Sequence, residues 1–95
     1  MTSQQISFLR GLAHKLNPVV MIGNNGLSET VLKEIDASLN AHELIKIKVQ
    51  GDDRAVRTQM YQDICNTVNA IAVHHIGKQL VIYRKADKPK IVIPD

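Results

Sequence analysis

The strand pattern at residues 44 to 49 places the strongest constraint on the fold of this chain. It reads Leu-Ile-Lys-Ile-Lys-Val, so apolar side chains on one face alternate with Lys46 and Lys48 on the other. A strand that is buried on both faces reads instead as a continuous apolar run. We therefore expect a sheet with one covered face and one open face, which argues against a doubly wound fold.

Helix and strand patterns alternate along the rest of the chain. Apolar residues at helical spacing predict helices at 3–16 and 29–40, and a third helix that starts at Gly51-Asp52-Asp53. Strands are predicted at 19–22, 44–49, 70–76 and 79–85, and the two-residue loop Gly77-Lys78 joins the last two as a hairpin. The tail at 86–95 contains two prolines and either docks as an extended segment or stays loose.

The order α-β-α-β-α-β-β predicts a single domain of the α/β class, because 95 residues bury one core. Right-handed crossovers make the first three strands parallel, and the hairpin pairs the last strand antiparallel to its predecessor. If one face of the sheet is polar, the crossover helices share the other face. The expected architecture is a two-layer α/β sandwich with a mixed four-stranded sheet.

Several functional classes are disfavoured by the composition. No apolar run approaches the roughly 20 residues of a membrane span, and no signal-peptide pattern opens the chain, so a cytoplasmic location is expected. Cys65 is the only cysteine, which excludes an internal disulfide and a thiolate metal cluster. His74 and His75 are adjacent in a strand and point to opposite faces, which argues against joint metal binding. We expect no enzyme, no metal and no cofactor.

A glycine turn joins the first strand to the second helix. It reads Gly23-Asn24-Asn25-Gly26, and Ser28 follows as a preferred N-cap. Together, the strand, the turn and the helix N-terminus place backbone N–H groups around a small concavity that suits an anion such as phosphate. The turn lacks the Lys-Ser/Thr of a nucleotide-binding P-loop. The alternative interpretation is an ordinary strand-to-helix turn that needs glycine for its backbone angles.

Basic residues are distributed around the expected positions of this turn and of the open sheet face. The net charge is +3, and no acid occurs before Glu29. A basic surface attracts a polyanion and makes its binding salt-dependent, although each lysine could also simply solvate a strand edge or a helix face. The candidates for this electrostatic contribution are Arg10, Lys15, Lys46, Lys48, Arg54, Arg57, Lys78 and Arg84.

Three blocks of sequence resemble the CRM domain (chloroplast RNA splicing and ribosome maturation) in its single-domain bacterial YhbY-type form. They are 20–28, 42–48 and 76–84, and the resemblance covers nearly the whole chain in order. It implies an RNA-binding fold similar to the C-terminal domain of translation initiation factor three, and association with precursors of the large ribosomal subunit. The family's Gly-x-x-Gly loop, which is likened to the KH-domain loop that clamps nucleic-acid backbone, maps to Gly23 through Gly26.

These observations predict a non-catalytic RNA-binding domain that associates with precursor large-subunit ribosomal RNA and assists ribosome assembly. Gly23 and Gly26 would let the backbone approach phosphate, and Asn24 and Asn25 would offer side-chain hydrogen bonds. With only three aromatic residues, recognition is expected to favour backbone and shape over base stacking.

Two other classes of function stay open. A protein-interaction adaptor would use a helical face or an exposed sheet edge, and its binding would respond little to salt. A small-anion enzyme would need a titratable group near the glycine turn, where His14 and Lys15 are the remote candidates.

Overall fold

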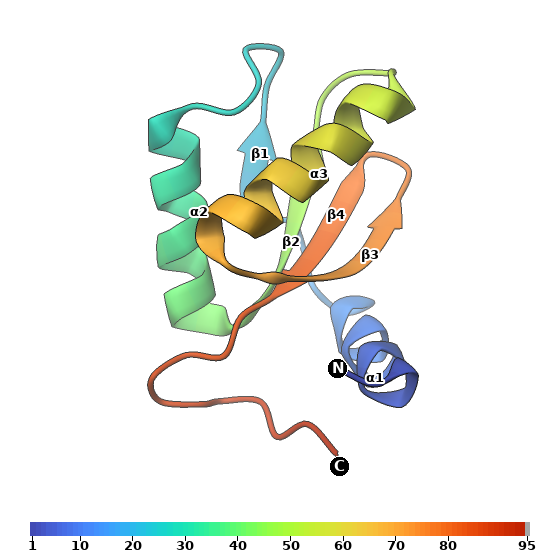
Figure 1. Ribbon diagram of the computed structural model, residues 1–95, viewed down its shortest axis with the longest axis vertical. Coiled ribbons are helices and arrows are strands. Elements are labelled where there is room, and N and C mark those ends of the chain that lie inside the picture. Colours follow the sequence, from blue (N-terminus) through green and yellow to red (C-terminus); the bar gives the residue numbers. More distant parts are fainter. Residues whose placement is uncertain (95) are drawn as a thin grey trace.

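The computed structural model describes residues 1–94 and confirms the predicted order of helices and strands (Figure 1). The first helix is shorter than predicted, because tight turns from Lys15 to Leu12 and from Leu16 to Ala13 replace its last helical hydrogen bonds. The elements are α1 (Ser3–Ala13), β1 (Val20–Ile22), α2 (Glu29–His42), β2 (Leu44–Val49), α3 (Arg54–Val68), β3 (Ile71–Ile76) and β4 (Gln79–Tyr83).

Each helix begins at a side chain that caps it. Thr2 accepts a hydrogen bond from the Gln5 backbone N–H at 3.1 Å, and the Gln5 side chain accepts one from the Thr2 N–H at 2.9 Å. This reciprocal capping box starts α1. Ser28 accepts from the Val31 N–H at 3.2 Å to start α2, and Asp53 caps α3 in the same way. These short polar signals therefore fix the helix starts.

The sheet is mixed, with strand order β1-β2-β4-β3. β1 pairs parallel to β2, and β4 pairs antiparallel to both β2 and β3. The first three strands consequently run in one direction, as predicted, and the last strand of the hairpin lies between β2 and β3. The two-residue turn of this hairpin has Gly77 at φ +54°.

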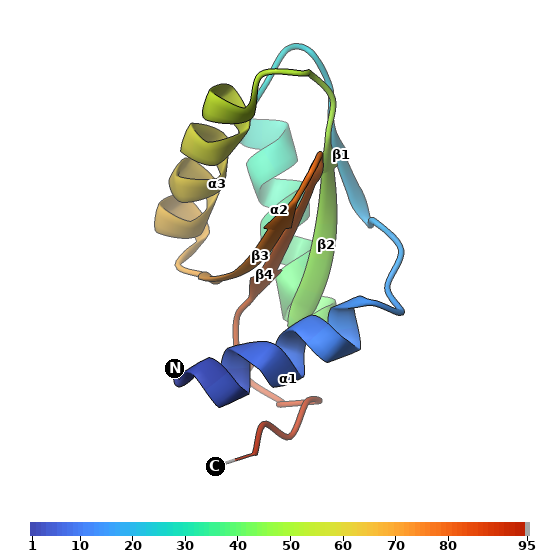
Figure 2. The ribbon, with the colours of Figure 1, turned by 90° about the vertical axis from the view of Figure 1, so that its right-hand side faces the viewer.

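The main core lies between the sheet and the pair α2 and α3, which share one face of it (Figure 2). The apolar residues of β2 predicted to face the core are all buried there, as are alternate residues of β1 and β4. This confirms the helix-covered face of the two-layer sandwich. The fully buried side chains of this core are Val20, Ile22, Ile35, Leu39, Ile45, Ile47, Val49, Ile64, Leu80 and Ile82.

The opposite face of the sheet is open over only half of its area. α1 packs against the other half and buries a second apolar cluster that includes Leu9, Leu44 and Val81. Lys48 stays exposed and Lys46 is half-buried. The prediction of a fully open face is therefore wrong for the part next to α1. β4 explains the difference, because its run Leu-Val-Ile-Tyr is continuously apolar and so covered on both faces.

The C-terminal tail docks beneath the sheet, which decides between the two alternatives left by the sequence (Figure 1). Backbone N–H groups of Ala86, Lys90 and Ile91 donate to the side-chain carboxylate of Glu43, at 2.9 Å from Ala86 and 2.8 Å from Ile91. Ile91 then packs with the α1 cluster. Asp95, the last residue of the predicted tail, lies outside the described residues.

Glu43 itself is fully buried where α2 ends and β2 begins. Burial alone would raise the pKa of its carboxyl, but the three backbone N–H bonds and the nearby Lys85 outweigh it and lower this pKa. The carboxylate therefore remains ionised inside the protein and joins the tail to the end of α2.

None of the helices within residues 1–94 combines the length and the apolar character that crossing a membrane requires.

Candidate nucleic-acid interface

The glycine turn forms the exposed loop between β1 and α2, at the top of Figure 1. The Gly26 N–H donates to the Gly23 carbonyl at 3.0 Å, which closes a tight turn that displays Asn24 and Asn25. Gly26 has φ +74°, a left-handed conformation that favours glycine. Gly23 has no such angle, and a Cβ built there would meet no atom within 4 Å. Neither backbone conformation nor internal packing requires glycine at 23, whereas close approach of an external group would.

The β2–α3 loop lies at the same end of the molecule as the glycine turn (Figure 1). The Gln50 N–H donates to the Ile22 carbonyl at 2.8 Å, which ties the two loops together directly before the turn. The N-termini of α2 and α3 therefore both point toward this end, and Arg54 lies exposed in the first turn of α3. The two helix dipoles and Arg54 favour negative charge at this end, although Glu29, Asp52 and Asp53 also lie there.

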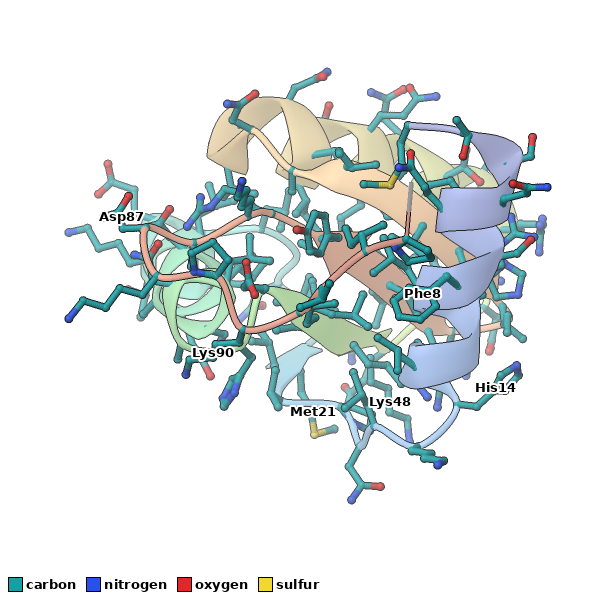
Figure 3. All side chains as sticks on the ribbon, turned by 90° about the horizontal axis from the view of Figure 1, so that it is seen from below. Phe8, His14, Met21, Lys48, Asp87 and Lys90 are labelled. Carbon is teal, nitrogen blue, oxygen red and sulfur yellow. The ribbon has the colours of Figure 1, made fainter. Side chains whose placement is uncertain are left out.

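The two lysines of β2 continue from the glycine turn along the open half-face. Met21 pairs with Lys48 across β1 and β2, and Figure 3 shows both side chains on the side away from α3, the side on which His14 also lies. Lys46 precedes Lys48 by two residues in β2 and therefore lies on the same face of the sheet. Arg10 of α1 and Lys15, two residues beyond its end, are exposed basic residues at the border of this area. We call the set Arg10, Lys15, Lys46 and Lys48 the basic face.

Acidic side chains are absent from the elements that form this area. No acid occurs before Glu29, and β2, β3 and β4 contain none. Lys78, in the hairpin turn, differs in having an ionic partner, since its Nζ lies 3.0 Å from the carboxylate of Asp52. The hydrogen bond and the charge of Lys78 lower the pKa of Asp52. Both side chains are exposed, so this pair is weak and Lys78 can exchange it for another anion.

Two of the predicted arginines are engaged inside the protein. Arg57 is 7% exposed, and its Nη1 donates to the Gly51 carbonyl at 2.8 Å, which holds the β2–α3 loop. Arg84 binds Asp36 at 2.7 Å and also donates to the Val68 carbonyl at 2.8 Å. Each guanidinium group already has at least one internal acceptor, so both residues have a structural role, and their contact with RNA stays a prediction.

Sequence reasoning missed two features next to the basic face. One is a small cavity that is lined by His14, His74 and Gln79 together with Lys46. The other is a mostly apolar groove of about 620 Å³, which runs between α1 and the sheet and has Lys15, Lys46 and His42 among its lining. No local pattern indicates either one, because each is assembled from elements far apart in the chain.

The adjacent histidines separate as predicted. His74 aligns with Val81 on the α1 side of the sheet, whereas the ring of His75 meets Tyr61 of α3 edge to face at 5.8 Å between centroids. The structure shows no group of three or more His, Cys, Asp or Glu side chains placed for a metal ion within residues 1–94. Burial raises the pKa of Cys65 to about 11, which disfavours a reactive thiolate.

Comparison with known families matches residues 1–84 to the CRS1 / YhbY (CRM) domain. The chain belongs to this family. It is 49% identical over 94 residues to a Haemophilus influenzae protein named RNA-binding protein, covering 99% of this chain and 95% of that one. It is 37% identical over 89 residues to a protein of Pseudomonas aeruginosa named a probable RNA-binding protein, covering 94% of this chain and 86% of the relative.

A solved structure supports the fold of this CRM chain. The solution structure of a hypothetical protein from Staphylococcus aureus superimposes with a TM-score of 0.87 at 33% sequence identity, over 99% of each chain. The resemblance read from the three sequence blocks is therefore confirmed at the level of family and fold.

Proposed function

We propose that this CRM protein binds RNA through the glycine turn and the basic face, without catalysing a reaction. The observation that carries the proposal is continuity: the turn leads through Met21 and Lys48 onto a lysine-bearing half-sheet whose strands contain no acid. Phosphate approaches the backbone at Gly23, and the basic face supplies the counter-charge. The names of the two relatives, which both describe RNA-binding proteins, support the same function.

We further propose that the RNA is ribosomal and belongs to precursors of the large subunit. The support comes from the family, whose single-domain members the chain resembles over nearly its whole length. This proposal places the protein in the cytoplasm. In-cell crosslinking followed by sequencing of the bound RNA tests it, and large-subunit precursor sequences should dominate the reads. Enrichment of unrelated RNA would reject the ribosomal assignment while keeping RNA binding.

The role of the glycine turn is tested by placing negative charge where phosphate should approach. The double variant Asn24→Asp, Asn25→Asp keeps short polar residues that tolerate turn geometry, so we expect the fold to persist. Affinity for a structured large-subunit RNA fragment should fall about tenfold or more, because the new carboxylates repel phosphate. Fluorescence anisotropy measures the affinity, and circular dichroism verifies folding.

A matched control adds the same charge elsewhere. Ala37→Asp with Asn66→Asp changes two exposed neutral residues, one in the second half of α2 and one in the last turn of α3. This control should lose much less affinity than the turn variant. Equal affinity of a folded Asn24→Asp, Asn25→Asp protein and the parent would show that the glycines serve only the turn.

The second candidate function is a protein-interaction adaptor, which the apolar groove beside α1 favours. Leu12 and Val19 line it and remain 37% and 45% exposed, and contiguous apolar surface rimmed by polar residues is typical of protein-binding sites. An adaptor would bind its partner with little response to salt, whereas RNA binding should weaken steeply. Binding measured at several ionic strengths separates the two functions.

A further inference from the structure

A small cavity between α1 and the sheet brings together four side chains able to carry positive charge. Arg10 of α1 and His14, the C-cap of that helix, lie four residues apart, and His14 keeps helical backbone angles, so both lie on one face of the helix. Lys46 of β2 and His74 of β3 both align with Val81 of β4, one on each side of it. These residues line a cavity of about 20 Å³, which we call the histidine pocket.

The size of the histidine pocket limits what can enter it. A cavity of this volume holds about one water-sized atom. A complete phosphate group is too large, but one of its non-bridging oxygens fits while the rest of the group stays at the mouth. Gln79 also lines the pocket and can donate from its side-chain amide.

The charge of the histidine pocket is not neutralised from within. Nε of Arg10 donates to the Val73 carbonyl at 3.0 Å, which holds the guanidinium beside the cavity and does not use its two terminal nitrogens. No carboxylate is among the lining residues. An anion is therefore the chemical complement of this cavity, and guanidinium and ammonium groups together suit phosphate.

We propose that the histidine pocket is a phosphate-binding site, in which a phosphate oxygen lies between Arg10, Lys46 and His74. The assignment of that phosphate to an RNA backbone rests on the proposed function, whereas the site itself needs only the anion. The pocket adjoins Lys48 and Met21 through the next row of the sheet, so one RNA strand can contact it and the glycine turn together.

This site makes binding dependent on pH. Burial first, and then the charges of Arg10, His14 and His75, lower the pKa of His74 from its ordinary value of 6.5. The groups that face it from α1, β2 and β4 are Arg10, His14, Lys46 and the uncharged Gln79, with His75 beside it in β3. None of these groups is a carboxylate, so a bound anion would be the negative partner that stabilises the protonated ring. Bound phosphate should favour the protonated ring. If it raises the pKa of one histidine by about one unit, affinity increases about tenfold on acidification.

Sulfate is the probe for the site itself, because its charge stays constant between about pH 5.5 and pH 8. In an NMR titration of the intact protein, sodium sulfate should raise the pKa of His74 and move the ring signals of His14. The ring signals of His42, which lies outside the pocket at the end of α2, should stay in place. Sodium chloride at equal ionic strength is the control, and equal responses to the two salts would overturn the proposal.

RNA is the probe for the biological ligand. The parent should bind a structured RNA several-fold more tightly at about pH 5.5 than at pH 8, and His14→Gln with His74→Gln should lose this gain. His42→Gln should keep it, and circular dichroism verifies that each variant is folded. A gain that survives in the folded double variant would overturn the pocket as its source.

The two proposals fail in different ways. If sulfate moves the signals of His74 but no RNA binds at any salt concentration, the proposed function fails and the pocket remains a site for a free phosphate anion. If RNA binds with equal affinity at both pH values and sulfate has no effect, RNA binding stands and the histidine pocket is rejected.

Discussion

At the scale of single residues, Glu43 makes more structural connections than its place in the sequence indicates. Its N–H donates to the Leu39 carbonyl at 2.8 Å, and its own carbonyl accepts from the Arg84 N–H at 2.9 Å. Its carboxylate takes three further N–H groups from the tail. Its φ of +65° is rare for a residue with a side chain, and these bonds together hold it there.

Replacing Glu43 with Gln should destabilise the protein by about 2 kcal/mol at neutral pH. Hydrogen bonds to a charged acceptor are stronger than those to an amide, and the amide also brings N–H donors toward the N–H groups of the tail. Urea denaturation measures the change. Glu34→Gln, at an exposed position of the same helix, is the control and should have almost no effect.

The same carboxylate predicts a pH dependence of the free energy of unfolding. Because the folded state lowers the pKa of Glu43, its stabilising contribution is complete above the pKa of the unfolded chain. This contribution is lost as the pH falls through the folded-state pKa. Acid should therefore destabilise the parent more than it destabilises the Glu43→Gln variant. Urea denaturation of both proteins at several acidic pH values measures the difference. Parallel pH profiles would contradict a buried, ionised role.

Which basic residues have internal partners is the part of the site that sequence indicates least. Arg84 and Lys48 are both basic residues of strands or strand ends, yet Lys48 is exposed whereas the side chain of Arg84 is only 20% exposed. The partners of Arg84 include Asp36 and Asn40, which come from α2 and lie more than 40 residues away in the chain. Charge alone reveals neither partner, so sequence cannot separate a binding arginine from one that ties a helix to a strand.

At the scale of elements, the alternation of β2 predicts opposite outcomes at neighbouring positions. Lys48→Ile should change stability by less than about 0.5 kcal/mol, because the side chain is exposed. Ile47→Lys should unfold the domain, because Ile47 is completely buried and the new charge would have no partner. Thermal denaturation of the two variants tests this. Comparable damage from both would contradict the open half-face.

The order of the elements, the helix starts and the burial of alternate residues in β2 could all be predicted from sequence, because each depends on residues that are close together in the chain. The covering of the second sheet face was readable in principle from the continuous apolar run of β4. The position of α1 was not, because its apolar stripe fits any exposed apolar surface. The histidine pocket follows from that position and is therefore equally hidden.

At the scale of the whole molecule, the basic face predicts how RNA binding responds to salt. Four cations in phosphate contact would give a slope of about −3 in a plot of log affinity against log salt concentration. Lys48→Ala should reduce the magnitude of that slope by about one and weaken binding to all RNA sequences alike. Anisotropy titrations between about 50 and 200 mM salt provide the measurement. A flat response would favour the adaptor.

The strand order has a consequence for when the chain can fold during translation. β4 is the last of the four strands to leave the ribosome, yet it occupies an interior position between β2 and β3. β1 and β2 can form only a two-stranded ribbon until then, and α1 must wait for Val81 and Tyr83 to complete the surface that it covers. The four-stranded sheet can therefore be completed only late, after nearly all of these residues have been synthesised.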